Sequence, residues 1–171
     1  MFAQDFPRNK RGWIKFPHDA TVRNQIFPEG VMGHPAKFNL FMTQSIIKQL
    51  YKPDDTIMDI MAGTGSIMIA ALSGCKIICI DCSEVYYELM LECKAQMLGA
   101  VPDADILVLL GNCMHYLPLP ANHICFSPPY VESFTSSDQF KLDALSLSKE
   151  EVETYLKGQS NLALVPEFFY F

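Results

Sequence analysis

The sequence lacks any long run of apolar residues, and this absence excludes a membrane-spanning helix. Half of the 171 residues are hydrophobic, but no uninterrupted apolar segment approaches the ~20 residues that cross a bilayer. The first five residues also lack the basic-then-apolar pattern of a secretion signal. We therefore expect a cytoplasmic protein that makes no membrane contact, and in which the six cysteines stay reduced.

Charged residues are scarce, at 19%, and acidic residues outnumber basic ones, which gives a net charge of −6. The imbalance is not uniform along the chain. Residues 1–40 hold six basic and three acidic residues, so the remaining chain is strongly acidic. A basic segment on an acidic body suits contact with phosphates, but it also suits a solvated tail. Charge alone favours neither interpretation.

Hydrophobic periodicity divides the chain into an arm and one domain. Prolines without a sustained period predict an extended basic arm over residues 1–37, followed by a domain over residues 38–171. Apolar runs predict short strands, and helical spacing with Ser83 as an N-cap and Gly99 as a terminator predicts helices. The expected strands are 56–60, 76–81, 105–110 and 123–127, and the expected helices are 38–51, 66–73, 83–98 and 147–157. This alternation predicts an α/β fold: a mostly parallel sheet with helices on both faces.

A glycine-containing turn follows the first expected strand, where α/β sheets bind ligands. In Asp59-Ile-Met-Ala-Gly63-Thr-Gly65 the glycines allow a tight turn and a close approach of the backbone to a ligand. The second strand ends in Asp81, whose carboxylate suits two ribose hydroxyls. Met68 occupies the position of the third glycine of a dinucleotide fingerprint, and Asp59 suits an ammonium group better than a pyrophosphate. These residues favour S-adenosylmethionine, which has a ribose and an ammonium group but no phosphate.

Three cysteines have a spacing that suggests a metal cluster. Cys75-Lys-Ile-Ile-Cys79-Ile-Asp-Cys82 matches the C-x3-C-x2-C pattern of radical S-adenosylmethionine enzymes. We reject this interpretation because Cys79 lies inside a predicted core strand and because the chain is too short for that family's barrel. We expect ordinary core cysteines and no metal site.

Three stretches occur in a consistent order, each at the tip of an expected element: His34-Pro35-Ala36-Lys37, the glycine turn DIMAGTGS, and Ser127-Pro128-Pro129-Tyr130. Together they resemble the motifs of the amino-group DNA methyltransferases, which modify N4 of cytosine or N6 of adenine. The S-P-P-Y form is more typical of the N4-cytosine enzymes. The resemblance implies a Rossmann-like methyltransferase fold with S-adenosylmethionine as cofactor and DNA as partner.

The resemblance also implies a role for each cofactor-binding residue. It assigns His34, Pro35 and Lys37 to the methionine end of the cofactor, and Asp59, Ala62, Gly63 and Gly65 to its amino-acid group. Asp81, followed by Cys82, is assigned to the ribose, and Asn112, followed by Cys113, to the adenine. Asn112 departs from the acid that the family usually has, but its carbonyl can still accept a hydrogen bond.

The implied chemistry explains the catalytic tetrapeptide. An exocyclic amine is a poor nucleophile, so an acceptor on each N–H is needed to free its lone pair. Ser127 Oγ is one expected acceptor, and the other is the carbonyl of Pro128, aimed by the extended geometry that Pro129 imposes. Tyr130 is expected to stack on a base that has swung out of the duplex.

The chain is shorter than the resemblance leads one to expect. The family's sheet has seven strands, and only four are expected here, with 41 residues following Tyr130. Three explanations remain open: a missing C-terminal segment, a split enzyme completed by a partner chain, and a remnant that binds without methylating. Two alternative functions also remain open, a non-catalytic subunit that needs a partner and an RNA amino-methyltransferase.

Overall fold

The structure is a computed structural model, and it describes residues 2–33 and 37–127. The motif residues His34, Pro35, Pro128, Pro129 and Tyr130, together with the helix expected at 147–157, lie outside the described residues.

Four parallel strands form the sheet. They are β1 (Thr56–Asp59), β2 (Lys76–Asp81), β3 (Ile106–Leu110) and β4 (His123–Ile124), and their order across the sheet is β3-β2-β1-β4. Every adjacent pair is parallel, so all four strands end at one edge, here called the carboxyl edge. The strand assignment and the parallel α/β fold predicted from the apolar runs are confirmed, although β4 is shorter than expected.

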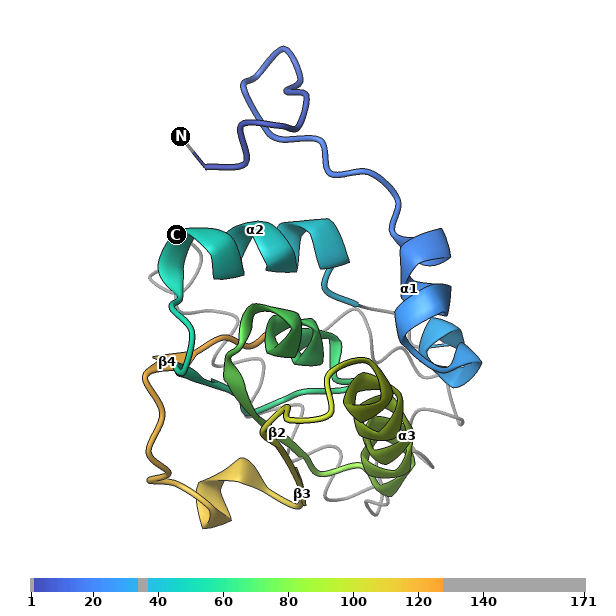
Figure 1. The fold of residues 1–171 in the computed structure, drawn as a ribbon, viewed down its shortest axis with the longest axis vertical. Helices are drawn as coiled ribbons and strands as arrows, with labels where there is room; N and C mark the ends of the chain where they lie inside the picture. Colours follow the sequence, from blue (N-terminus) through green and yellow to red (C-terminus); the bar gives the residue numbers. More distant parts are fainter. Residues whose placement is uncertain (1, 34–36, 128–171) are drawn as a thin grey trace, which may run out of the picture.

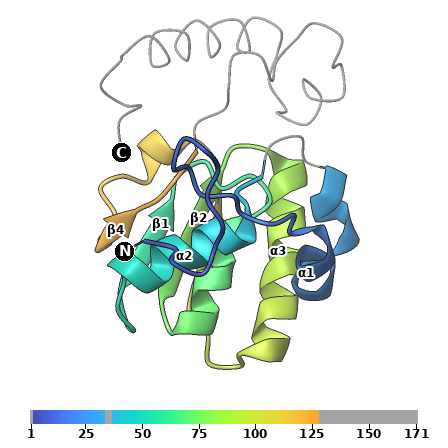
Figure 2. The ribbon, with the colours of Figure 1, turned by 90° about the horizontal axis from the view of Figure 1, so that it is seen from above.

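Three helical segments cover one face of this sheet: α2 (Leu40–Leu50), η2 (Ser66–Ser73) and α3 (Glu84–Ala100). They stand side by side in Figure 2, and their apolar side chains form one core with alternate strand residues such as Ile57 and Ile77. The opposite strand positions, Met58, Ile78 and Ile80, pack against the chain that follows β3, which includes the short helix η3 (Cys113–His115). The predicted helix at 66–73 has these limits but is a 3-10 helix.

Side-chain caps set the starts of the two α-helices on the sheet. Asn39 Oδ1 accepts hydrogen bonds from the N–H groups of Phe41 and Met42 at the start of α2. Ser83 Oγ accepts one from Tyr86 N–H at the start of α3, which confirms the predicted cap. The prediction that Gly99 ends this helix is wrong, because α3 continues to Ala100. Pro102 is the effective terminator, since proline disfavours helical geometry at the residue before it.

The N-terminal arm is not extended throughout, contrary to the prediction. It contains α1 (Ala20–Ile26) and a 3-10 turn, η1 (Glu29–Gly33) (Figure 1). The sequence gives little sign of α1, because seven residues are too few to show a hydrophobic period. Its stability comes from tertiary contacts, chiefly of the buried Arg23. Among the described residues, no helix is long and apolar enough to cross a membrane.

Candidate active site

The glycine turn connects the end of β1 to η2 at the carboxyl edge. Gly63 and Gly65 have φ values of 52° and 72°, in the left-handed region that favours glycine. The turn is closed by two hydrogen bonds, from Ala62 N–H to Ile80 O (3.0 Å) and from Gly65 N–H to Ala62 O (2.8 Å). A Cβ atom at Gly65 would lie only 3.0 Å from Met68 Cε. The backbone at this turn is therefore both tight and fixed.

Asp81 holds this turn in place. Its Oδ2 accepts a hydrogen bond from Gly63 N–H (2.7 Å), and its Oδ1 accepts one from Ser83 N–H (2.9 Å). Burial raises the pKa of the Asp81 carboxyl, and these backbone hydrogen bonds oppose the shift. Each carboxylate oxygen retains a second acceptor position. The arrangement leaves room for hydrogen bonds from two hydroxyl groups of a ligand, which is what the ribose assignment requires.

Asp59 is a buried carboxyl with few compensating contacts. Its side chain is 3% exposed, and it accepts one hydrogen bond, from Met61 N–H (3.0 Å). Burial raises its pKa to about 7, and the nearby Asp81 carboxylate adds to the shift, whereas the Met61 hydrogen bond opposes it. A cation beside this group would offset the unfavourable burial of its charge. The pair of acids thus fits S-adenosylmethionine, with hydroxyl groups at Asp81 and an ammonium group at Asp59.

The end of β3 lies beside the end of β2, as the adenine assignment requires. Gly111 N–H donates a hydrogen bond to the backbone oxygen of Asp81 (2.8 Å). The next residue, Asn112, is exposed, and its Oδ1 caps η3 by accepting a hydrogen bond from Met114 N–H (2.9 Å). One acceptor position of that oxygen is therefore used within the protein, and the second remains for a ligand.

The two cysteines assigned to the cofactor site lie at the ends of the same strands. Cys82 follows β2, and Cys113 begins η3 after β3. Burial raises the pKa of Cys82 to about 11, with smaller contributions from Asp81 and Cys113. Cys82 is therefore a neutral thiol at physiological pH. Cys75 and Cys79 are buried core residues, as predicted, and no cluster of metal-binding side chains occurs within residues 2–33 and 37–127.

Ser127 lies just beyond β4, next to the strand that carries Asp59. β4 pairs with β1 through Ile57–His123 and Met58–Ile124, and Cys125 N–H continues the pairing by donating to Met58 O (2.9 Å). Ser127 follows two residues later and is half-buried. The topology therefore brings Ser127 to the edge that holds the glycine turn, whereas Pro128, Pro129 and Tyr130 lie outside the described residues.

Lys37 belongs to the motif that precedes α2. Its Nζ donates a hydrogen bond to Met32 O (3.1 Å). Burial lowers its pKa, as does the charge of Arg23, while Asp19 opposes the shift. This ammonium group is thus directed at backbone of the arm, and His34 and Pro35, which share its motif, lie outside the described residues.

Arg23 gave no site signal in the sequence, yet it is the most buried charged residue among those that the structure describes, at 1% exposed. Its guanidinium donates to Ser66 Oγ (2.7 Å), to Asp19 Oδ2 (2.7 Å) and to the backbone oxygen of Phe38. Ser66 directly follows Gly65, so Arg23 joins α1 and the start of α2 to the glycine turn. The only sequence sign of this role is the i, i+4 spacing of Asp19 and Arg23, a pattern common on exposed helices.

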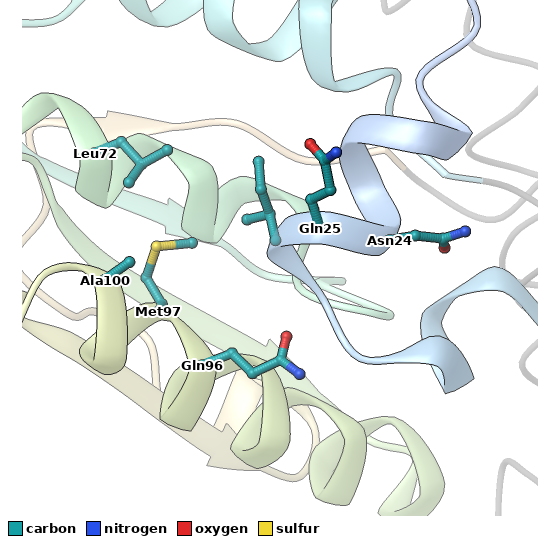
Figure 3. Close-up of a pocket in the computed structure, with 7 residues that line it drawn as sticks. Asn24, Gln25, Leu72, Gln96, Met97 and Ala100 are labelled. Atoms are coloured by element: carbon teal, nitrogen blue, oxygen red, sulfur yellow. The ribbon is translucent and has the colours of Figure 1, made fainter.

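A cavity of about 310 Å³ lies elsewhere, between α1, η2 and α3 (Figure 3). Leu72 and Ala100 are at the ends of η2 and α3 farthest from the glycine turn and from Asp81. None of its lining residues is ionisable, and none was predicted as a site residue: they are Asn24, Gln25, Ile26, Leu72, Gln96, Met97 and Ala100. The cavity is therefore separate from the candidate active site.

Several solved structures resemble this one at low sequence identity. TrmN from Thermus thermophilus is 17% identical, with a TM-score of 0.47, over 58% of this chain and 31% of that protein. The SAM-dependent methyltransferase from Agrobacterium tumefaciens is 16% identical, with a TM-score of 0.43, over 53% and 30%. The M. jannaschii tRNA m1G37 methyltransferase is 22% identical, with a TM-score of 0.41, over 63% and 31%. The chain thus spans less than a third of each of these proteins.

The sequence comparisons give a more specific result. No curated protein matches the chain. Residues 8–92 match the family of N6 and N4 methyltransferases described as DNA methylase. The match runs from the arm through the glycine turn and Asp81 into α3, and it includes Lys37 and Asp59. It confirms the resemblance seen in the motifs: the chain belongs to the DNA methylase family, whose cofactor is S-adenosylmethionine.

Proposed function

We propose that this chain transfers a methyl group from S-adenosylmethionine to an exocyclic amino group of a DNA base. One observation carries the proposal: β4 pairs with β1, which brings Ser127 to the edge that holds Asp59 and the glycine turn. A catalytic acceptor and a cofactor site then share one edge of the sheet. The family supports methyl transfer as the reaction, and the choice of DNA and of the base is part of the proposal.

The cofactor supplies an electrophilic methyl group on a sulfonium, and the protein's part is to bind and orient both reactants. Asp81, fixed by Gly63 and Ser83, accepts hydrogen bonds from the ribose hydroxyls. Asp59 accepts the ammonium group, whose positive charge keeps this buried carboxyl ionised. The fixed left-handed turn at Gly63 allows backbone to pass close to the bound molecule.

Ser127 provides the acceptor for the amine of the base. A serine hydroxyl has two lone pairs, either of which can accept a hydrogen bond from an N–H group of the base. The carbonyl of Pro128 is the proposed second acceptor, and Tyr130 the proposed stacking surface for the base. Two fixed acceptors favour the geometry in which the amine's lone pair points at the methyl group, without a covalent intermediate.

Methyl transfer from labelled S-adenosylmethionine to duplex DNA tests the proposal. The full chain is expected to label DNA, and Ser127→Ala is expected to lower the rate by roughly 100-fold, because the reacting amine is deprived of a preorganised acceptor. Cofactor affinity should be unchanged. Ser73→Ala, at the exposed end of η2, is the matched control and should retain full activity.

Three results would contradict this proposal. Equal rates for Ser127→Ala and the unaltered chain would remove Ser127 from the reaction. Transfer to RNA but not to DNA would favour the alternative of an RNA amino-methyltransferase, and cofactor binding without transfer to either would favour a subunit that needs a partner chain. Nucleoside analysis of the labelled DNA then identifies the base, and the S-P-P-Y form leads us to expect N4-methylcytosine rather than N6-methyladenine.

A further inference from the structure

We propose that residues 8–15, here called the basic loop, form a second DNA contact, in which Trp13 stacks on an unstacked base and the surrounding cations contact phosphates. This inference rests on the proposed function, since it extends the recognition of the same substrate. It addresses a part of the chain that the cofactor site and Ser127 do not use.

Internal hydrogen bonds and a β-bridge order the basic loop. Asn9 Oδ1 accepts hydrogen bonds from the N–H groups of Arg11 (2.8 Å) and Trp13 (3.0 Å), and Asn9 N–H donates to Trp13 O (2.8 Å). Gly12, with a φ of 80°, makes the turn between them. An antiparallel bridge joins Arg8 to Ile14 on either side of the turn. The backbone position of Trp13 is therefore set before any partner binds, which reduces the entropy lost on binding.

Aromatic contacts attach the loop to the body of the protein near the active site. The Phe6 ring packs edge-on against Phe16 (5.1 Å between centroids) and against Phe41 in the first turn of α2 (6.0 Å). That end of α2 is the one nearer the glycine turn, because Arg23 bonds both Phe38 and Ser66. Figure 2 shows the arm, in dark blue, running across α2.

The surface of the loop combines an exposed aromatic ring with positive charge, although the Arg8 guanidinium also donates to the backbone oxygens of Gly12 (2.8 Å) and Phe2 (3.1 Å). Trp13 is 64% exposed, and the Arg11 guanidinium lies 5.5 Å from the centre of its ring. Residues 2–16 hold four basic residues and one acidic residue. Within the described part of the chain, none of these four forms an ion pair, and all are exposed: Arg8, Lys10, Arg11 and Lys15.

This combination matches the two surfaces of an unpaired nucleic-acid strand. Aromatic rings stack on bases regardless of sequence, and nearby cations follow the phosphates. An enzyme that moves a base out of a duplex leaves the neighbouring bases partly unstacked. The strongly acidic remainder of the chain confines favourable phosphate contacts to the arm, which favours binding in a defined orientation.

The sequence provides a direct probe, because Trp13 is the sole tryptophan of the chain. Its fluorescence reports on the basic loop alone. A DNA duplex with one mismatched base, titrated into the full chain with S-adenosylmethionine present, is expected to quench this emission in a saturable way. Binding of labelled DNA, followed by anisotropy, without any change in Trp13 emission would overturn the proposal.

Substitutions separate the ring from the charges. Trp13→Ala is expected to weaken DNA binding by about 5- to 100-fold, which corresponds to the usual value of one base–aromatic stack. Lys10→Ala with Arg11→Ala is expected to flatten the salt dependence of log K by about 0.7–0.9 for each phosphate that these side chains neutralise. Lys48→Ala and Lys76→Ala remove the same charge at exposed positions outside the loop and should leave both quantities unchanged.

The outcomes distinguish this inference from the proposed function. Cofactor affinity, measured by calorimetry, should be the same in every variant, which shows that the fold is intact. DNA affinity that is equal in Trp13→Ala and the unaltered chain overturns the basic-loop contact and leaves methyl transfer untouched. Binding to RNA or to anionic lipid vesicles that is tighter than binding to DNA also overturns it. DNA binding that depends on the loop but leads to no methyl transfer overturns the proposed function instead.

Discussion

Among single residues, Asp59 is the one whose burial costs the most stability and is most readily explained by the proposed ligand. Its carboxyl is buried, accepts one hydrogen bond and faces a second acid, Asp81, and its pKa rises to about 7. An apolar residue or an amide in this place would favour stability more than an acid does. A bound cation would offset the cost of burying the Asp59 carboxylate, and the proposed ammonium group of the cofactor is such a cation.

The pH dependence of Asp59→Asn tests this interpretation. Because the folded-state pKa of about 7 exceeds the usual 3.8, the folded protein holds an extra proton between these values, and its stability falls as pH rises through this window. Asp59→Asn should remove this slope and leave the variant more stable at pH 8, by on the order of 3 kcal/mol. Urea unfolding at pH 4, 6 and 8 measures the difference.

The exposed Asp105 supplies the control for this experiment. Asp105→Asn should unfold with the same pH dependence as the unaltered chain. Identical slopes for Asp59→Asn and the unaltered chain would show that burial does not shift the Asp59 pKa. Asp59→Asn should also bind S-adenosylmethionine more weakly, although it is the more stable protein, since stability and cofactor binding impose opposite demands on this residue.

The site residues on the glycine turn could be predicted because their chemistry is local. Gly63, Gly65 and Asp59 follow one strand within a few positions, and the preference of glycine for left-handed backbone is readable from sequence. Arg23 could not be predicted in the same way. Its partner Ser66 is 43 positions away, and nothing in the spacing of Asp19 and Arg23 distinguishes a buried pair from a solvated one.

At the scale of elements, Arg23 connects three segments that would otherwise share few polar contacts. It donates to Asp19 beside α1, to Phe38 before α2 and to Ser66 at the start of η2. Arg23→Met should destabilise the protein by about 3–5 kcal/mol, because Asp19 is left as a partly buried carboxylate without its partner. Chemical denaturation measures this change.

Gln25→Ala is the matched control, because Gln25 lies on the exposed side of the same helix and should change stability by less than about 0.5 kcal/mol. Arg23→Lys keeps the charge without the forked geometry and should recover a part of the stability. Equal stabilities for Arg23→Met and Gln25→Ala would show that α1 is held by its apolar contacts instead.

The strands and the long helices could be predicted from the sequence, whereas the short or irregular helical segments could not. The continuous apolar runs define β1, β2 and β3 almost to the residue, because β1 and β2 are buried on both faces and β3 packs one face on the core, although Leu107 on its other face is exposed. α1 has too few residues to show a period, and η2 is a 3-10 helix although its composition suits an ordinary helix. Both outcomes depend on tertiary contacts, which local propensity does not contain.

At the scale of the whole molecule, the strand order brings residues far apart in sequence to one edge. Since β2 and β4 flank β1, Asp81 and Ser127 stand on either side of the glycine turn. The parallel direction of the strands could be predicted from the alternation of elements, whereas the order β3-β2-β1-β4 could not. The place of the basic loop over α2 could not, because it depends on Phe6, Phe16 and Phe41 packing together.

Cofactor binding should stabilise the entire chain. S-adenosylmethionine at 100 times its dissociation constant is expected to add about 2.7 kcal/mol to the free energy of unfolding, seen as a higher melting temperature in calorimetry. Asp81→Ala should abolish this increase, and Asp105→Ala, which removes an exposed acid at the opposite end of a strand, should retain it. An unchanged increase in Asp81→Ala would exclude Asp81 from the cofactor site.

The Arg23 contact with Ser66 has a consequence for the proposed DNA contact and the proposed cofactor site, because it connects the segments that carry them. The arm that carries the basic loop also carries Arg23, a few residues further along the chain, whose guanidinium donates to Ser66 beside the glycine turn. A DNA strand bound at the proposed basic-loop contact would therefore be connected through Arg23 to the turn that we propose contacts the cofactor. Where such a coupling exists, it is reciprocal: the cofactor changes the DNA affinity by the same factor as DNA changes the cofactor affinity. We therefore expect this short stretch to be the place where the binding of DNA and the binding of the cofactor are coupled.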